Sequence, residues 1–234
     1  MSESSAGDPS EAAGLAPRWH TALLVSLILA VVISGTLLAP SAARASTAPS
    51  GSRVTELYLP MLLSQWGLAF YVCRIGRSRS ALRELLGTGW NGPARAFGDL
   101  ALACLGWGLV QGGELLAAAA FGLSHASARA SLLPASPVEQ AVWVLVAVSV
   151  GFCEELVYRG YLLAQLGAFS GSIVAGSLLQ AALFGLAHGE QGAGIALRFG
   201  AYGLLFAALA GFRRSLVPSI LSHIALDLSA AFFH

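Results

Sequence analysis

Charged side chains are scarce in this chain of 234 residues: they make up 11% of it, whereas 56% of its residues are hydrophobic. Soluble globular domains carry about 25% charged residues. The hydrophobic residues also occur in long runs rather than in amphipathic stripes. This shortage of charge argues against a soluble domain and favours a protein that crosses a membrane several times.

Lysine is absent, so all 13 basic residues are arginine. Together with the abundant Ala and Gly, this preference indicates a GC-rich bacterial genome. The net charge is only +1, which gives no reason to expect a nucleic-acid partner. Cysteine is rare as well: the three cysteines are isolated, and no CxxC or Cys/His spacing predicts a structural zinc site or a disulfide framework.

Seven apolar segments are present, and most of them reach the roughly 20 residues that span a bilayer. Backbone N–H and C=O groups in lipid must bond within their own segment, so we expect each segment to be a helix. The sequence therefore predicts an all-α, multi-pass transmembrane bundle of about seven helices. The segments are residues 21–38, 54–73, 96–123, 137–166, 170–188, 193–212 and 216–233.

The chain divides into residues 1–17, a predicted disordered tail, residues 18–136, the N-terminal membrane helices, and residues 137–234, a catalytic helical core. The first apolar segment exceeds the roughly 7–15 residues of a secretory signal, which favours an uncleaved helix. Residues 74–95 carry five arginines. By the positive-inside rule this link and the N-terminus lie in the cytoplasm, as expected for a protein of the bacterial inner membrane.

Residues 153–159 read Cys-Glu-Glu-Leu-Val-Tyr-Arg inside the fourth apolar segment. Ionisable residues deep in a membrane are costly and usually functional. Glu155 and Arg159 are four residues apart, so on a helix they share a face and can pair. Glu154 points elsewhere without a local countercharge, which makes it a candidate general base. The alternative is a helix end at the cytoplasmic surface, where both side chains reach water.

Two histidines stand in the later apolar segments. His188 follows Phe184 by four residues, and a lone His at a helix end is more often an interfacial hydrogen-bonding residue than a catalyst. It reaches Glu154 only if the fourth helix is long and tilted or the fifth is short. His223 and Asp227 share a helix face, so the carboxylate can fix the tautomer and orientation of the imidazole. The alternative is a pair that only hydrogen-bonds at the interface.

Together these residues resemble the motifs of the CAAX-protease and bacteriocin-processing family of intramembrane proteases, also called the Abi family. The matching positions, in the family's order, are Glu154-Glu155 with Arg159, Phe184 with His188, and His223 with Asp227. The resemblance covers about residues 137–232. It implies an intramembrane endopeptidase that cleaves a peptide bond of a membrane-associated protein.

The resemblance also implies a role for each residue. Glu154 would activate water, and His188 would assist the water or the tetrahedral intermediate. His223, held by Asp227, would donate to the oxyanion or to the leaving amine. Glu155 and Arg159 would brace the site.

One position departs from the family pattern. The prenyl-protein endopeptidases, which trim three residues from a prenylated C-terminus, typically have Asn in place of Asp227. An Asn amide can donate to an oxyanion and an ionised Asp cannot, so an oxyanion role does not transfer. The departure weakens the case for a prenylated substrate. A C-terminal sorting tail and a lipidated protein both remain open as substrates in contact with membrane lipids.

Two other functions remain open. No cofactor is favoured, but zinc is an alternative, with Glu154, His188 and His223 as ligands of a zinc-dependent intramembrane protease. Against zinc, the chain has no His-Glu-x-x-His run. A non-enzymatic membrane binding or immunity protein is the other alternative.

Four further polar residues need partners in an apolar chain. Glu114 is expected either to line the cavity or to pair with Arg198 across two helices, and the structural pair is favoured. Gln111, Tyr158 and Glu190 are candidate cavity-wall residues without an assigned role.

Overall fold

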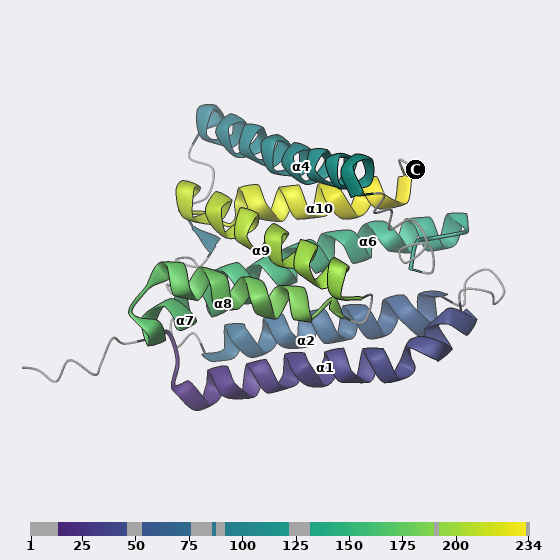
Figure 1. The fold of residues 1–234 in the computed structure, drawn as a ribbon, viewed down its shortest axis with the longest axis horizontal. Helices are drawn as coiled ribbons and strands as arrows, with labels where there is room; N and C mark the ends of the chain where they lie inside the picture. The colour runs from purple at the N-terminus through teal and green to yellow at the C-terminus, as the bar shows by residue number, and fades with distance from the viewer. Residues whose placement is uncertain are drawn as a thin grey trace, which may run out of the picture.

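The computed structural model describes residues 14–45, 53–75, 86–87, 92–121, 132–189 and 192–232. Within these ranges the chain forms seven helical rods, and its one β interaction is an isolated bridge between Gly87 and Ser215. The prediction of an all-α bundle is confirmed (Figure 1). The elements are α1 (Arg18–Ala45), η1 (Val54–Tyr58), α2 (Leu59–Ile75), α4 (Pro93–Phe121), α6 (Pro137–Glu154), η2 (Glu155–Leu162), α7 (Leu163–Ser170), α8 (Ile173–Leu186), α9 (Ala193–Arg213) and α10 (Val217–Phe232).

The longest rod runs through α6, η2 and α7 without a break, from Pro137 to Ser170. Its start follows from the local sequence: Ser136 caps the helix by accepting from the N–H of Glu139, and Pro137 occupies the first turn. Gly171 ends it in the left-handed conformation that helix C-caps require. This rod is also the most buried of the candidate membrane spans, so it forms the centre of the bundle.

Among the described residues, three helices are long and apolar enough to cross a membrane: Pro93–Ala120, Pro137–Ser170 and Ala193–Arg213. The remaining rods include shorter apolar helices. Large apolar side chains cover the outer surface, and those of Phe212, Phe97 and Leu197 are 81%, 78% and 78% exposed. Water would make such exposure costly, whereas lipid tails are equally apolar. The chain is therefore an integral membrane protein.

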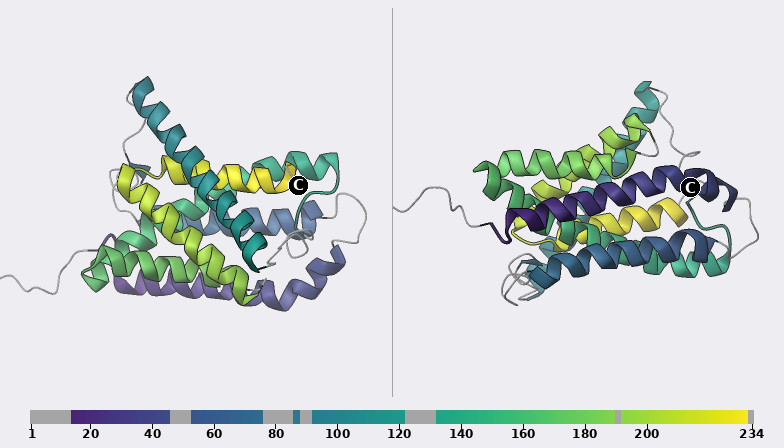
Figure 2. Two further views of the ribbon diagram at one scale, coloured as in Figure 1. Left: turned by 45° about the horizontal axis from the view of Figure 1, so that its top comes forward. Right: turned by 90° about the horizontal axis from the view of Figure 1, so that it is seen from below.

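Packing around the central rod brings distant segments together. Helix α2 packs against α6, and α10 packs against both α6 and α4 (Figures 1 and 2). Helix α8 turns back along α7 and packs against α9. A Cβ at Gly185 would collide with the carbonyl oxygen of Ala196, so glycine permits the close approach of α8 and α9.

The glycines of α4 differ in how closely other helices approach them. A Cβ at Gly106 would meet the Ser222 hydroxyl oxygen at 2.5 Å, so this glycine allows α4 and α10 to approach closely. Gly108, Gly112 and Gly113 would meet nothing within 4 Å. Gly106 therefore serves helix packing, whereas the other three lie on faces of α4 that no helix of the described residues covers.

The start of the chain is described only from residue 14, so most of the predicted tail lies outside the described residues. Glu190, one of the candidate cavity-wall residues, also lies outside them. Residues 14–17, which end that tail, contact the central rod. The N–H of Ala16 donates to Oε1 of Gln165 at 3.2 Å. The first helix is thereby fastened to α7 directly before it begins at Arg18.

Candidate active site

The double glutamate lies where the central rod changes its winding. Glu154 is the last residue of α6 and Glu155 the first of η2, a π-helical stretch closed by the N–H of Leu163 donating to the carbonyl of Tyr158. Such wide turns are rare and often mark functional sites. The Glu155 side chain is fully buried in mid-rod. The alternative of a helix end whose side chains reach water is therefore wrong.

Glu155 and Arg159 form the predicted ion pair, with 2.9 Å between Oε1 and the guanidinium nitrogen. The guanidinium also lies 4.1 Å from the ring centre of Phe184 and 5.3 Å from that of Phe206. Aromatic faces attract a desolvated cation, so these rings and the carboxylate together stabilise the buried arginine. Phe184, which the sequence offered only as part of a motif, has a physical role in holding Arg159.

His223 lies between the two glutamates. Its Nδ1 is 3.0 Å from Oε1 of Glu155, and its Nε2 is 3.7 Å from Oε2 of Glu154. An ionised carboxylate can only accept, so Nδ1 carries a hydrogen and donates it to Glu155. The Asp227 carboxylate is 3.9 Å from Nε2 and is the more exposed of these groups, at 29%. Glu155, rather than Asp227, is thus the carboxylate in hydrogen-bond contact with the ring.

Glu154 has two differently placed oxygens. Its Oε1 accepts from the side-chain amide of Gln65 at 2.6 Å. Its Oε2 is buried and has no hydrogen-bond partner among the described residues. Gln65 comes from α2, and sequence reasoning missed it. The available signal was an amide inside the apolar segment 54–73, since a polar side chain in such a run needs a partner.

His188 lies just beyond α8, joined to the cluster through Phe184. Its Nδ1 is 2.9 Å from the Phe184 carbonyl, and its ring stacks on Phe199 at 3.8 Å. The Phe184 ring centre is 4.9 Å from that of His188 and 6.1 Å from that of His223. Helix α8 has only 14 residues, so the condition of a short fifth helix is met.

A metal site was one alternative for these residues. No group of three His, Cys, Asp or Glu side chains in the described ranges is arranged to hold a metal ion. Glu154, His188 and His223 are therefore not gathered into a zinc-ligand set in this structure, and we derive no step through a metal.

Other buried polar groups have separate partners. Glu114 pairs with Arg198 at 2.9 Å and accepts from the Tyr202 hydroxyl, which confirms the predicted cross-helix pair. Tyr158 is 4% exposed and packs on Phe184. Gln111 is half-buried on α4.

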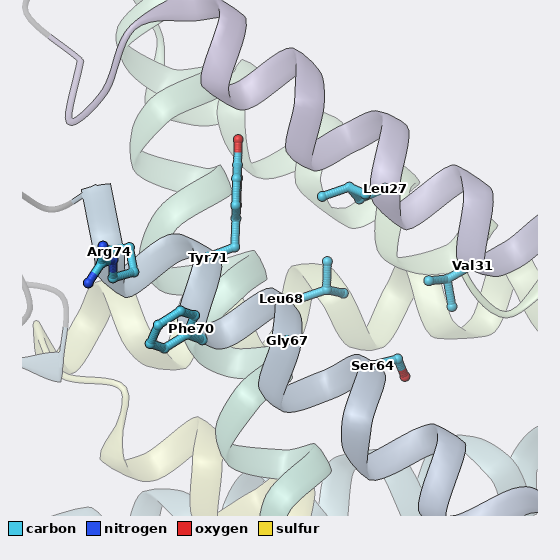
Figure 3. A pocket seen from close by; sticks show the side chains of 8 residues that line it. All are labelled: Leu27, Val31, Ser64, Gly67, Leu68, Phe70, Tyr71 and Arg74. Carbon is cyan, nitrogen blue, oxygen red and sulfur yellow. The ribbon is translucent and has the colours of Figure 1, made fainter.

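An apolar groove of about 550 Å³ lies between α1 and α2, away from the glutamates. Leu27 and Val31 line it from α1, whereas its remaining lining residues come from α2 (Figure 3). None of the cluster residues Glu154, Glu155 and His223 lines this groove.

A family model described as type II CAAX prenyl endopeptidase Rce1-like matches residues 136–229. Residues 136–229, fewer than half of the chain, are thus similar to this family and are termed the Rce1-like region. The match confirms the family resemblance seen in the motifs. No curated protein and no solved structure gives a significant match.

The Rce1-like region runs from the cap of α6 into α10, so it contains both glutamates, His188, His223 and Asp227. Gln65 lies outside it. The family match supports intramembrane endopeptidase activity in general.

Proposed function

We propose that this protein is an intramembrane endopeptidase in which Glu154 activates a water molecule for attack on a peptide bond. One observation carries the proposal: the unpartnered Oε2 of Glu154 faces Nε2 of His223 across 3.7 Å. That separation is too long for a direct hydrogen bond, so a water within about 2.8 Å of both atoms would lie beside the line that joins them rather than between them.

The side chains of Glu154 and His223 are each fixed by a hydrogen bond to the atom that does not react. Gln65 donates a hydrogen bond to Oε1 of Glu154, and Glu155 accepts one from Nδ1 of His223. Each side chain therefore has one polar edge left, and these two edges face each other. Preorganised groups of this kind need little reorganisation during a reaction. Such preorganisation contributes much of the rate enhancement of many enzymes.

In the proposed reaction Glu154 takes a proton from the water while the water oxygen attacks the carbonyl carbon of the scissile bond. The tetrahedral intermediate then collapses when the leaving amine receives a proton from Nε2 of His223. Glu155 and Asp227 stabilise the imidazolium form that supplies this proton, and Arg159 keeps Glu155 in place. His188, reached through Phe184, would assist the intermediate.

The proposed substrate is a protein whose scissile bond reaches the cluster from the membrane. A C-terminal sorting tail or the end of a lipidated protein fits this description. The partly exposed Asp227 marks the edge of the cluster nearest to the surface.

Glu154→Gln tests the catalytic assignment. The amide keeps the shape of the side chain and cannot accept the proton, so cleavage of a tagged membrane substrate by purified protein should fall at least about 10³-fold. His223→Ala should cause a comparable loss, and His188→Ala a smaller one. Combining Glu154→Gln with His223→Ala should cost little more than either change alone, because the two act as one unit.

Two results would decide between this mechanism and its alternatives. Full activity in Glu154→Gln would remove the catalytic assignment. Loss of activity on exhaustive chelation, with recovery on adding zinc, would replace direct catalysis by a metal mechanism. We expect chelation to leave the rate unchanged and elemental analysis of active protein to find no stoichiometric zinc.

A further inference from the structure

Glu154 is held by a residue that the Rce1-like region does not contain. Gln65 lies on α2, 89 positions before Glu154 in the chain, and donates its Nε2–H to Oε1 of Glu154 at 2.6 Å. The family match starts only at residue 136. The N-terminal helices therefore reach the centre of the candidate site.

The direction of this hydrogen bond follows from chemistry. An ionised carboxylate has only acceptors, so the amide nitrogen of Gln65 must face it. When Glu154 is ionised this hydrogen bond is charge-assisted, and such bonds are roughly twice as strong as neutral ones. Glu154 is only 7% exposed, so few waters could take over the role of this donor.

The contact also decides which oxygen reacts. With Oε1 bound to Gln65, the carboxylate plane is fixed and Oε2 is left facing Nε2 of His223. Without the amide the carboxylate could rotate about its terminal torsion, which is broad and roughly two-fold. The same donor stabilises the ionised form of Glu154, the form that accepts a proton from water.

We propose that Gln65 is a positioning residue of the active site, which orients Glu154 as the base and keeps it ionised. The inference rests on the proposed function of Glu154. It makes the active site composite: α2 supplies the orienting donor, whereas the central rod and α10 supply the reacting groups.

The groups that influence Glu154 come from three elements. His223 faces it from α10, where Asp227 lies 3.9 Å from the same ring nitrogen. Glu155, Arg159 and Tyr158 lie on its own rod, and Gln65 is its neutral partner from α2. Replacing Gln65 leaves the charges of all the others unchanged. A change in the pH profile therefore reports on the lost donor.

Gln65→Met tests the proposal in the full-length protein, since methionine keeps the length of the side chain and lacks the N–H. We expect kcat to fall about 10–100-fold with KM nearly unchanged, because the base is misplaced rather than the substrate. The acidic limb of the kcat profile should move to higher pH, because the carboxylate has lost a donor. Gln65→Asn, which keeps the amide one methylene short, should retain more activity than Gln65→Met.

Gln180→Met is the matched control. Gln180 is a fully buried glutamine on α8 whose amide donates to the Gly203 carbonyl at 3.0 Å, so its loss should lower stability. Activity per folded molecule and the pH profile should not move. If Gln65→Met behaves in the same way as Gln180→Met, Gln65 is merely structural and the inference is overturned.

Infrared spectroscopy separates this inference from the proposed function. The difference spectrum between a protein and its Glu154→Gln counterpart isolates the carboxylate band of Glu154. We expect this band to shift when Gln65 is Met, and an unshifted band would overturn the contact. An active Glu154→Gln protein would instead refute the proposed function, whatever the band does. Should Gln65→Met not fold, Gln65→Asn carries the same spectroscopic test.

Discussion

Buried acids behave differently in two regions of this molecule. Between the N-terminal helices and the Rce1-like region, three ion pairs of the described residues each join one acid to one arginine of the other region. They are Arg53 with Glu139 at 3.1 Å, Glu114 with Arg198 at 2.9 Å, and Asp99 with Arg213 at 2.5 Å. At the centre of the Rce1-like region the arrangement is not one to one.

Three carboxylates, those of Glu154, Glu155 and Asp227, lie there within 3.9 Å of the His223 ring nitrogens. Glu155 is shared by Arg159 and His223, whereas Glu154 has the Gln65 amide on one oxygen and no hydrogen-bond partner among the described residues on the other, buried oxygen. An acid with its own arginine is neutralised and can only fasten helices together. An acid with an incomplete set of partners retains the capacity to take up a proton. The presence or absence of a dedicated arginine therefore distinguishes a structural ion pair from a candidate site.

The largest effect should follow from Arg159→Ala. Its removal leaves the fully buried Glu155 without its cation, and breaking such a pair costs about 3–5 kcal/mol. We expect activity to be lost along with the stability, measured as a drop in the denaturation midpoint in detergent. The double change Glu155→Gln with Arg159→Gln should recover part of that stability. A double mutant as unstable as the sum of the two single mutants would contradict the pairing.

Arg53→Ala should have the next largest effect, on stability alone. Glu139 would keep the N–H of Ala135 at 2.9 Å but lose its cation, so we expect a cost of about 1–3 kcal/mol. Activity per folded molecule should equal that of the wild type, because this pair does not contact the glutamate cluster. A specific loss of activity would show that the two regions are coupled more closely than their contacts indicate.

Glu114→Gln should have a smaller effect. The two side chains of this pair are 21% and 15% exposed, and polar contacts between membrane helices contribute about 0.6 kcal/mol on average. We expect a stability change of about that size and an unchanged rate of cleavage. Loss of activity here would place α4 and α9 in the reaction and weaken the contrast between structural pairs and the site.

Cys153→Ser should have the smallest effect, although Cys153 directly precedes Glu154. The thiol is fully buried in an apolar cluster with Ala69, Leu156, Ala210 and Leu216. A thiol in such surroundings is chemically inert, so we expect cleavage within about two-fold of wild type. Inactivation by the serine substitution, or by thiol reagents that spare the serine variant, would bring a cysteine nucleophile back into consideration.

Short-range features could be read directly from the sequence. Long apolar runs predicted the helical membrane bundle, because backbone groups in lipid have no other stable arrangement. The spacing of Glu155 and Arg159 predicted their ion pair, because residues four apart on a helix are neighbours whatever surrounds them. The family motifs identified the histidines and glutamates, and the family match confirms that resemblance over residues 136–229.

Only the tertiary structure decided which groups meet across helices. It placed Glu155 on Nδ1 of His223, where the sequence had suggested Asp227, and it brought Gln65 of α2 to Glu154. Neither contact could be read from spacing, because each depends on how separate rods pack rather than on the 3.6-residue period within one rod. Periodicity fixes the face on which a side chain lies, whereas the hydrogen-bond partner depends on which helix packs against that face.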